Sequence, residues 1–250
     1  MNSRRMIALV KLNVKKIIRE PAYLFLMILF PALLTLSFGL AFAETPSAIS
    51  GVSQFDFMVP GLYGYACIFI IMTVAQAFAD DREEGLLKRI NVTPTTSGEF
   101  MGSYIISNII ISLLQVVIVA VLTIILGFRP NRGALEFLIA AFFIGLLSIC
   151  SVGLGLITAT VAKSSSTATG LAFIFILPQM FFGTFIPMTE TTEAIAMFLP
   201  SHYATNSVEM LISGTTLTEI TIWINFAILA IISIVIVIFG IELFKKFGNK

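Results

Sequence analysis

The sequence has few charges, one histidine and two cysteines. Charged residues make up 12% of its 250 residues and hydrophobic residues 58%, and the mean hydropathy is +1.00. This balance lies well outside that of soluble domains and predicts an integral membrane protein. Because His202 is the only histidine, a histidine metal site or a catalytic histidine pair has nothing to build from. Cys67 and Cys150 lie inside apolar runs, where packing is the simplest role for a thiol.

Motifs that supply energy are also missing. The chain has no G-x-x-x-x-G-K-[ST] phosphate loop, so it cannot hydrolyse ATP by that route and is not expected to be an enzyme. No Asp, Glu, Lys, Arg or His lies within the long apolar runs, where ion-driven carriers commonly place such groups. A pump built on this chain therefore needs energy from another subunit. The net charge of +1 gives no support for a nucleic-acid partner.

Six apolar runs are long enough to cross a bilayer, which takes about 20 helical residues. Their continuous apolar character favours helices over the alternating strands of a barrel. We therefore expect an all-α membrane protein with six transmembrane helices in one domain, residues 1–250. The expected spans lie near 23–43, 59–79, 103–127, 137–162, 166–186 and 220–241.

The distribution of Lys and Arg predicts the orientation. Thirteen of the fifteen lie in the N-terminal segment, the connection after the second span, the connection after the fourth span and the C-terminal segment. Only Arg129 and Arg132 fall on the other side. Since positive residues are retained in the cytoplasm, both termini and the connection after the second span are expected there, in a multi-pass protein of the cell membrane.

Residues 1–22 form a basic leader with helical periodicity. One side carries Ile7, Val10, Val14 and Ile17, and the other carries Arg4, Lys11, Lys15 and Arg19. Such an amphipathic helix is expected in the membrane interface, either as a plain anchor and topology signal or as a docking surface for a partner. The leader is too long for a signal peptide and has no small-residue cleavage site, so the first span is expected to be retained, beginning near Pro21.

The stretch from Asp80 to Gly102 places eight charges between two uncharged spans. Its part Asp81–Ile90 is predicted to form a short helix, with Glu84 and Lys88 as an ion pair one turn apart. Gly85 in the middle implies either a bend or a close contact with another group. Thr96 and Glu99 form a predicted capping box for the third span. From physics alone, the stretch is either a solvated loop or a docking element.

Two further patterns concern helix contacts and the segment before the last span. Thr191–Leu199 is apolar enough for a short helix but too short to cross, which favours a broken or re-entrant element on the outer side. Thr216 and Glu219 are expected to cap the last span. Ser151 and Gly155 form a small-xxx-small pair, which predicts close helix contact within one subunit or between two.

Three groups of short motifs follow one another along the chain. They read Arg19-Glu20-Pro21, Phe30-Pro31 and Phe38-Gly39; then Glu84-Gly85, Leu86-Leu87, Thr93-Pro94 and Gly102; then Phe182-Gly183-Thr184-Phe185-Ile186-Pro187 and Pro200-Ser201-His202-Tyr203-Ala204. In order and topology they resemble the permeases of the type-2 ATP-binding-cassette (ABC) exporter family, which includes drug- and lipid-efflux members. The chain departs from that family's pattern at Leu86, where a small Thr is common, at Ser103, where a Lys often stands, and at Glu209-Met210, where an Arg is frequent.

This resemblance implies a cytoplasmic coupling helix that docks on a separate ATPase subunit, which would hold ATP and magnesium. No cofactor is implied in this chain, and two copies of the permease would pair in the bilayer. An outer gate is implied at Phe182, Phe185 and Pro187, with a plain amphipathic loop or lipid-facing packing as the alternatives. The implied ATPase-coupling residues are Arg82, Glu83, Glu84, Gly85, Leu86, Leu87 and Arg89.

We therefore predict a permease subunit of an ATP-driven exporter, with an outward direction implied by the resemblance alone. Because its spans carry no charge, the expected substrate is apolar or amphipathic, such as a drug-like molecule or a lipid. The alternatives are an ATPase-independent channel or secondary carrier, and a membrane-embedded enzyme, for which the span cores offer only Ser, Thr, Asn and Gln.

Overall fold

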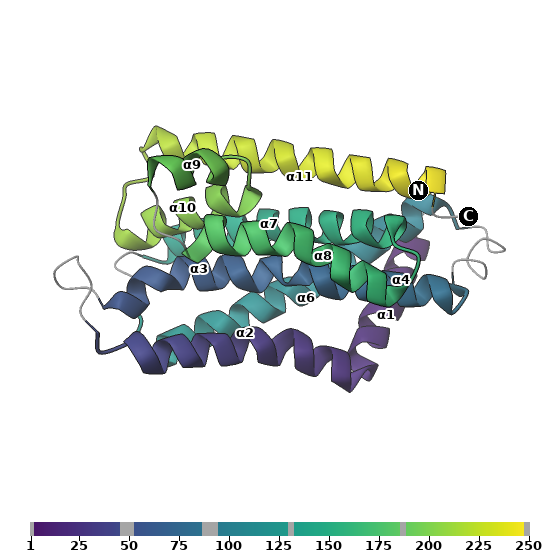
Figure 1. The fold of residues 1–250 in the computed structure, drawn as a ribbon, viewed down its shortest axis with the longest axis horizontal. Coiled ribbons are helices and arrows are strands. Elements are labelled where there is room, and N and C mark those ends of the chain that lie inside the picture. Colours follow the sequence, from purple (N-terminus) through teal and green to yellow (C-terminus); the bar gives the residue numbers. More distant parts are fainter. Residues whose placement is uncertain (1–2, 46–52, 87–94, 130–132, 186–188, 248–250) are drawn as a thin grey trace.

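The computed structural model describes residues 3–45, 53–86, 95–129, 133–185 and 189–247. These residues are almost entirely helical, and the long helices run side by side along the long axis of the molecule (Figure 1). Both ends of the chain lie at one end of this bundle, together with α1 and the last turn of α4. We call this the basic end, because α1 and α4 bring Lys and Arg side chains to it, and the opposite end the α10 end.

Five helical stretches are long and apolar enough to cross a membrane, and they coincide with the second to sixth expected spans. The first expected span falls on α2 (Pro21–Phe42). The uninterrupted apolar part of α2 within the described residues, Met27–Phe42, is shorter than each of the five stretches. The five stretches are Gln54–Glu83, Gly98–Ile125, Leu135–Val161, Ser165–Gly183 and Ile220–Phe244. They are built from α3 (Gln54–Ile68), α4 (Ile70–Glu83), α6 (Ser97–Ile125), α7 (Ala134–Val161), α8 (Ser165–Met180) and α11 (Ile220–Phe247).

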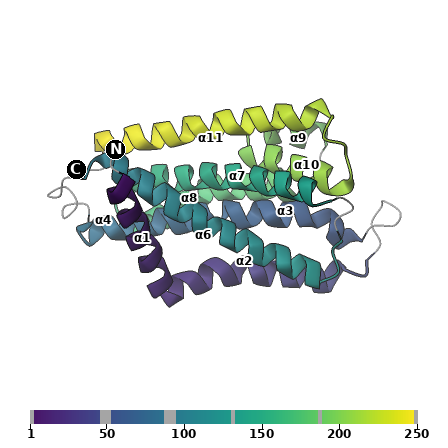
Figure 2. The same cartoon turned by 180° about the vertical axis from the view of Figure 1, so that it is seen from behind.

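The N-terminal helix, α1 (Ser3–Arg19), lies across the basic end of the bundle rather than along it (Figure 2). It packs chiefly on α6. Its predicted apolar side divides: Ile17 is buried and Val10 and Val14 are half-buried, whereas Ile7 is 67% exposed. Much of that side therefore packs against protein, which leaves the basic side and Ile7 at the surface.

The helix predicted over Asp81–Ile90 does not begin at Asp81. Instead, α4 continues to Glu83, and the N–H of Glu84 still donates to the carbonyl of Asp80 at 2.9 Å. After the C-cap residue Glu84, Gly85 turns the chain away from the helix with a φ of +74°, a left-handed conformation that favours glycine. No atom lies within 4 Å of the position that a Cβ would take there, so within the described chain the glycine makes a bend and not a close contact.

Helix α7 lies at the centre of the bundle and packs against α4, α10 and α11. A Cβ on Gly155 would stand 2.8 Å from the carbonyl oxygen of Ile71 and 2.8 Å from Cβ of Val74. The glycine thus lets the backbones of α7 and α4 approach each other closely. Of the two possibilities left open by the small-xxx-small pair, the structure shows contact within one chain.

The span-length stretch Ser165–Gly183 changes its winding near the α10 end. After Met180 the chain continues as a short π-helix, η1 (Phe181–Phe185). A short helix, α9 (Glu190–Ala196), follows where Thr191–Leu199 predicts one, and α10 (Pro200–Ser213) comes next and packs on α7 and α11.

Helix caps give one confirmed and one wrong prediction. Thr96 Oγ1 accepts the N–H of Glu99 at 3.2 Å and Glu99 Oε2 accepts the N–H of Thr96 at 3.1 Å, as a capping box requires. The predicted box at the start of the last span is wrong, because Glu219 precedes the first helical residue, Ile220. The N–H of Glu219 donates instead to the carbonyl of Thr216 in a turn.

Candidate functional site

Three consecutive charged residues form the last turn of α4, and we call Asp81, Arg82 and Glu83 the charged junction. Successive residues on a helix point about 100° apart, so three neighbours reach in three directions. Each of these side chains contacts a different part of the protein: Asp81 contacts α1, Arg82 the end of α7 and Glu83 the start of α8. The junction therefore connects four helices at the basic end.

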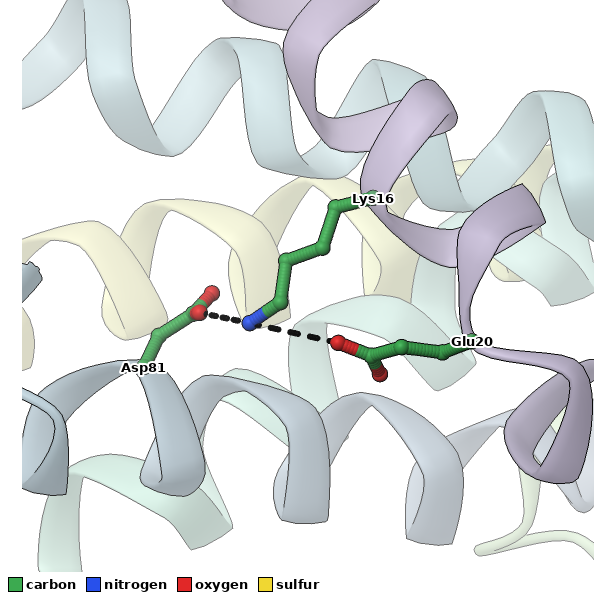
Figure 3. A network of polar contacts seen from close by, with 3 residues as sticks. All are labelled: Lys16, Glu20 and Asp81. Carbon is green, nitrogen blue, oxygen red and sulfur yellow. Dashed lines mark hydrogen bonds and ion pairs between the residues drawn. The ribbon is translucent and has the colours of Figure 1, made fainter.

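Asp81 is buried and forms an ion pair with Lys16 of α1 (Figure 3). Nζ of Lys16 donates to Oδ1 of Asp81 and lies 3.8 Å from Oε1 of Glu20. Burial alone lowers the pKa of Lys16, but the hydrogen bond and charge of Asp81, joined by nearby carboxylates, outweigh burial and raise it above its usual value. Lys16 is therefore charged at neutral pH and holds α1 against α4.

Arg82 contacts the C-terminal end of α7. Its guanidinium donates to the carbonyl of Thr160 at 3.4 Å and also to the carbonyl of Ala162. The last carbonyls of a helix have no donor within the helix, and the negative end of the helix dipole favours a cation. Arg82 supplies both the missing hydrogen-bond donor and the positive charge.

Glu83 contacts the N-terminal end of α8. Its Oε1 accepts the N–H of Ser165 at 2.7 Å, while Oγ of Ser164 accepts the N–H of Thr167 at 3.2 Å. The first N–H groups of a helix lack internal acceptors and favour an anion. Arg82 therefore places a cation at the negative end of α7, and Glu83 places an anion at the positive end of α8. Together the two residues hold both sides of the short α7–α8 connection.

The other predicted coupling residues lie at the turn that follows. Glu84 is exposed, Gly85 makes the bend and Leu86 is half-buried. Leu87 and Arg89 lie outside the described residues, as does the predicted partner of Glu84, Lys88. The structure therefore brings Arg82 and Glu83 into contacts within the chain and presents Glu84 at the surface.

Sequence reasoning missed the role of Asp81 and its partner Lys16. Lys16 is half-buried at the edge of the buried side of α1, next to Ile17, and a lysine in such a place needs an anion nearby. Asp81 lies two residues past the second expected span, on the same predicted side of the membrane as Lys16. Helical periodicity within each segment could not pair them, since the two residues are 65 positions apart.

The predicted outer-gate residues lie where η1 meets α10. Oγ of Ser201 donates to the carbonyl of Gln179 at 3.2 Å, and Oγ1 of Thr205 donates to the carbonyl of Gly183 at 2.6 Å. These contacts need Gly183, since a Cβ there would overlap Oγ of Ser201. Phe182 is half-buried in η1, and Phe185 is its last residue, although its side chain and all of Pro187 lie outside the described part of the chain.

The family model for ABC-2 type transporters matches residues 4–212, from the start of α1 to the last turn of α10. The chain belongs to the ABC-2 type transporter family. The expected family is thereby confirmed, and the protein is a multi-pass membrane permease of an ABC transporter. No curated protein matches the chain.

ABC-2 permeases are membrane transport components that are generally not catalytic and normally work with an ATPase subunit. The matched range includes the charged junction and the contact between η1 and α10. It leaves out α11, whose residues begin at Ile220.

Proposed function

We propose that this ABC-2 permease is the membrane subunit of an ATP-driven exporter for an apolar or amphipathic substrate, drug-like or lipid. A separate ATPase subunit would hold ATP and magnesium and dock at the basic end, and two permease copies would form the pathway. The observation that carries the proposal is the charged junction, because it links the turn at Glu84 and Gly85 to α1, α7 and α8. A push on that turn would move four helices together.

The proposed topology has six spans, with α2 as the first and the basic end in the cytoplasm of the cell. Helix α2 has 22 residues, and at 1.5 Å per residue this is about 33 Å, enough for the hydrocarbon core. Thirteen of fifteen Lys and Arg residues fall on the side given to the cytoplasm. Helix α1 would then lie in the inner interface, and α9 and α10 would form the outer segment with the gate at η1.

Coupling requires that two permease conformations differ in affinity for the ATP-bound partner. The exposed Glu84 is the sharpest candidate contact for that partner, with Leu86, Leu87 and Arg89 following it in the sequence. Arg82 and Glu83 would transmit the motion, because their hydrogen bonds end on α7 and α8. The substrate class follows from the expected spans, which contain no Asp, Glu, Lys, Arg or His.

The test uses charge reversal at the turn. The permease, as wild type, Glu84→Lys or Glu44→Lys, is co-expressed with a candidate ATPase subunit. Glu44 is also exposed but lies at the α10 end, past the end of α2. We expect Glu84→Lys to reduce co-purification and substrate-stimulated ATP hydrolysis about ten-fold, which corresponds to a loss of about 1.4 kcal/mol of binding free energy, and Glu44→Lys to change neither.

Two results would contradict the proposal. If Glu84→Lys and Glu44→Lys behave alike in both assays, the turn is not the docking point. If vesicles that contain the permease without any ATPase transport the substrate down its gradient at the full rate, the chain is a channel or carrier and not a pump subunit.

A further inference from the structure

A shallow groove of about 450 Å³ runs along the outward side of α1. Four cations and two small or apolar residues line it: Ala8, Lys11, Leu12, Lys15, Lys16 and Arg19. These residues recur at intervals of three and four, so they share one face of the helix. That face points away from α6, against which Asn13 and Ile17 are buried.

The positive charge in this groove is not neutralised by the rest of the described chain. Lys16 has Asp81 and Glu20 as partners, but in the described part no carboxylate lies within ion-pair distance of Lys11, Lys15 or Arg19. Three cations gathered on two turns of helix repel one another and attract an anion. The groove therefore fits a ligand that carries a phosphate.

Exposed apolar side chains beside the cations favour an amphiphile over a free ion. Leu12 lies among the cations and is 53% exposed, and Ile7 and Ile18 on the neighbouring flank are 67% and 59% exposed. Helix α1 also lies across the ends of the spans (Figure 2), where the headgroups of one leaflet would meet it. A phosphate between the cations and an acyl chain along the leucine and isoleucines would satisfy both kinds of surface.

We propose that this groove binds the headgroup of an anionic phospholipid and that the lipid competes with Asp81 for Lys16. Lys16 lines the groove and also donates to Asp81 of the charged junction. A phosphate drawn toward Lys16 would weaken the contact between α1 and α4, so lipid composition would tune the stiffness of the junction. The proposal shares with the proposed function only the position of α1 at the membrane interface, and it needs no ATPase and no transport.

The test counts lipids that stay bound to the purified permease in native mass spectrometry. Phosphatidylglycerol and phosphatidylcholine with identical acyl chains are added in equal amounts to wild type and to Lys15→Gln/Arg19→Gln. We expect the variant to lose the preference for phosphatidylglycerol about 25-fold, since each of the two lost cations contributes a factor of about five near an anionic surface. The control variant, Arg129→Gln/Lys163→Gln, loses the same number of positive charges at exposed sites outside the groove. It should keep the preference for phosphatidylglycerol.

A third variant tests the competition for Lys16. Asp81→Asn releases Lys16, so phosphatidylglycerol should be retained several-fold more strongly than by wild type. An unchanged preference in Lys15→Gln/Arg19→Gln, or an equal loss in the control, would overturn the site. Displacement of the lipid by millimolar inorganic phosphate would show a free-anion site instead of a lipid site. Unaltered retention in Asp81→Asn would refute the competition.

Discussion

His202 is the only side chain of the protein whose ordinary pKa lies close to neutral pH. It lies in the first turn of α10, half-buried, with its ring 5.3 Å from that of Tyr203. Its Nδ1 atom is buried and has no hydrogen-bond partner among the described residues. Burial lowers the pKa of His202 from its usual 6.5, and the charge of Glu193 opposes this only in part.

This environment predicts that acid weakens the folded permease through His202. Because the folded pKa is below 6.5, the unfolded chain takes up the proton first as the pH falls. The stability that His202 contributes is therefore full above pH 6.5 and is lost as the pH falls through the folded pKa. Thermal unfolding in detergent between neutral pH and pH 5 should show a larger drop for wild type than for His202→Gln. Parallel curves for the two proteins would contradict this.

At the scale of single residues, local chemistry was predictable and distant pairing was not. The capping box of Thr96 and Glu99 and the bend at Gly85 follow from neighbours in the sequence, and both are present. The ion pair of Lys16 and Asp81 and the bonds of Arg82 to α7 join residues 65 to 80 positions apart. They depend on how helices pack, which no single-sequence pattern contains.

Among the elements, the contact between η1 and α10 depends on one glycine. An alanine at 183 would place its Cβ over Oγ of Ser201 and 2.8 Å from Cβ of the same residue. Gly183→Ala should therefore push α10 from η1 and weaken the bond from Thr205 to the carbonyl of Gly183. We expect a loss of about 1–3 kcal/mol in unfolding free energy, as for other overpacked sites.

The matched control is Gly170→Ala in the same span. No atom lies within 4 Å of its added Cβ, and alanine is the better helix former, so thermal stability should hold or rise. Gly183→Ala/Ser201→Gly removes the overlapping side chain and should recover part of the loss. If Gly183→Ala is as stable as wild type, the close contact does not hold the two elements together.

Prediction of the elements from sequence worked for five of the six expected spans but did not give the bounds of α10. Long apolar runs mark the five span-length helices clearly. The buried face of helix α10 consists mostly of small and polar residues, among them Ser201, Ala204, Thr205 and Val208. Their spacing of three and four is helical, but hydropathy alone does not reveal it. Ser201 and Thr205 can be buried because their hydroxyls donate to carbonyls of the stretch Ser165–Gly183.

For the whole molecule, the charged junction is where α1, outside the span bundle, is fastened to it. Asp81 is almost fully buried in this contact, with its side chain 4% exposed, whereas that of Lys16 is 31% exposed. Removing the lysine leaves a buried carboxylate without its cation, and such losses are costly because the charge cannot recover its hydration. Composition predicted a membrane protein and the motif resemblance its family, but neither predicted that the leader is held by an ion pair to α4.

The final prediction exchanges the two charges of this contact. Lys16→Met should lower the unfolding free energy in detergent by about 1–3 kcal/mol, less than the roughly 3–5 kcal/mol of fully buried pairs, because Lys16 is partly exposed. Asp81→Lys should destabilise as well, by placing two cations together. The exchange Lys16→Asp/Asp81→Lys restores an attractive pair, so its loss should be smaller than the sum of the losses of Lys16→Asp and Asp81→Lys.

The control is Lys163→Met, at another exposed site of the basic end, which should change the unfolding free energy little. Simple additivity in the exchange variant would show that the charges do not interact, and α1 would then be held to the bundle by its apolar contacts with α6 alone.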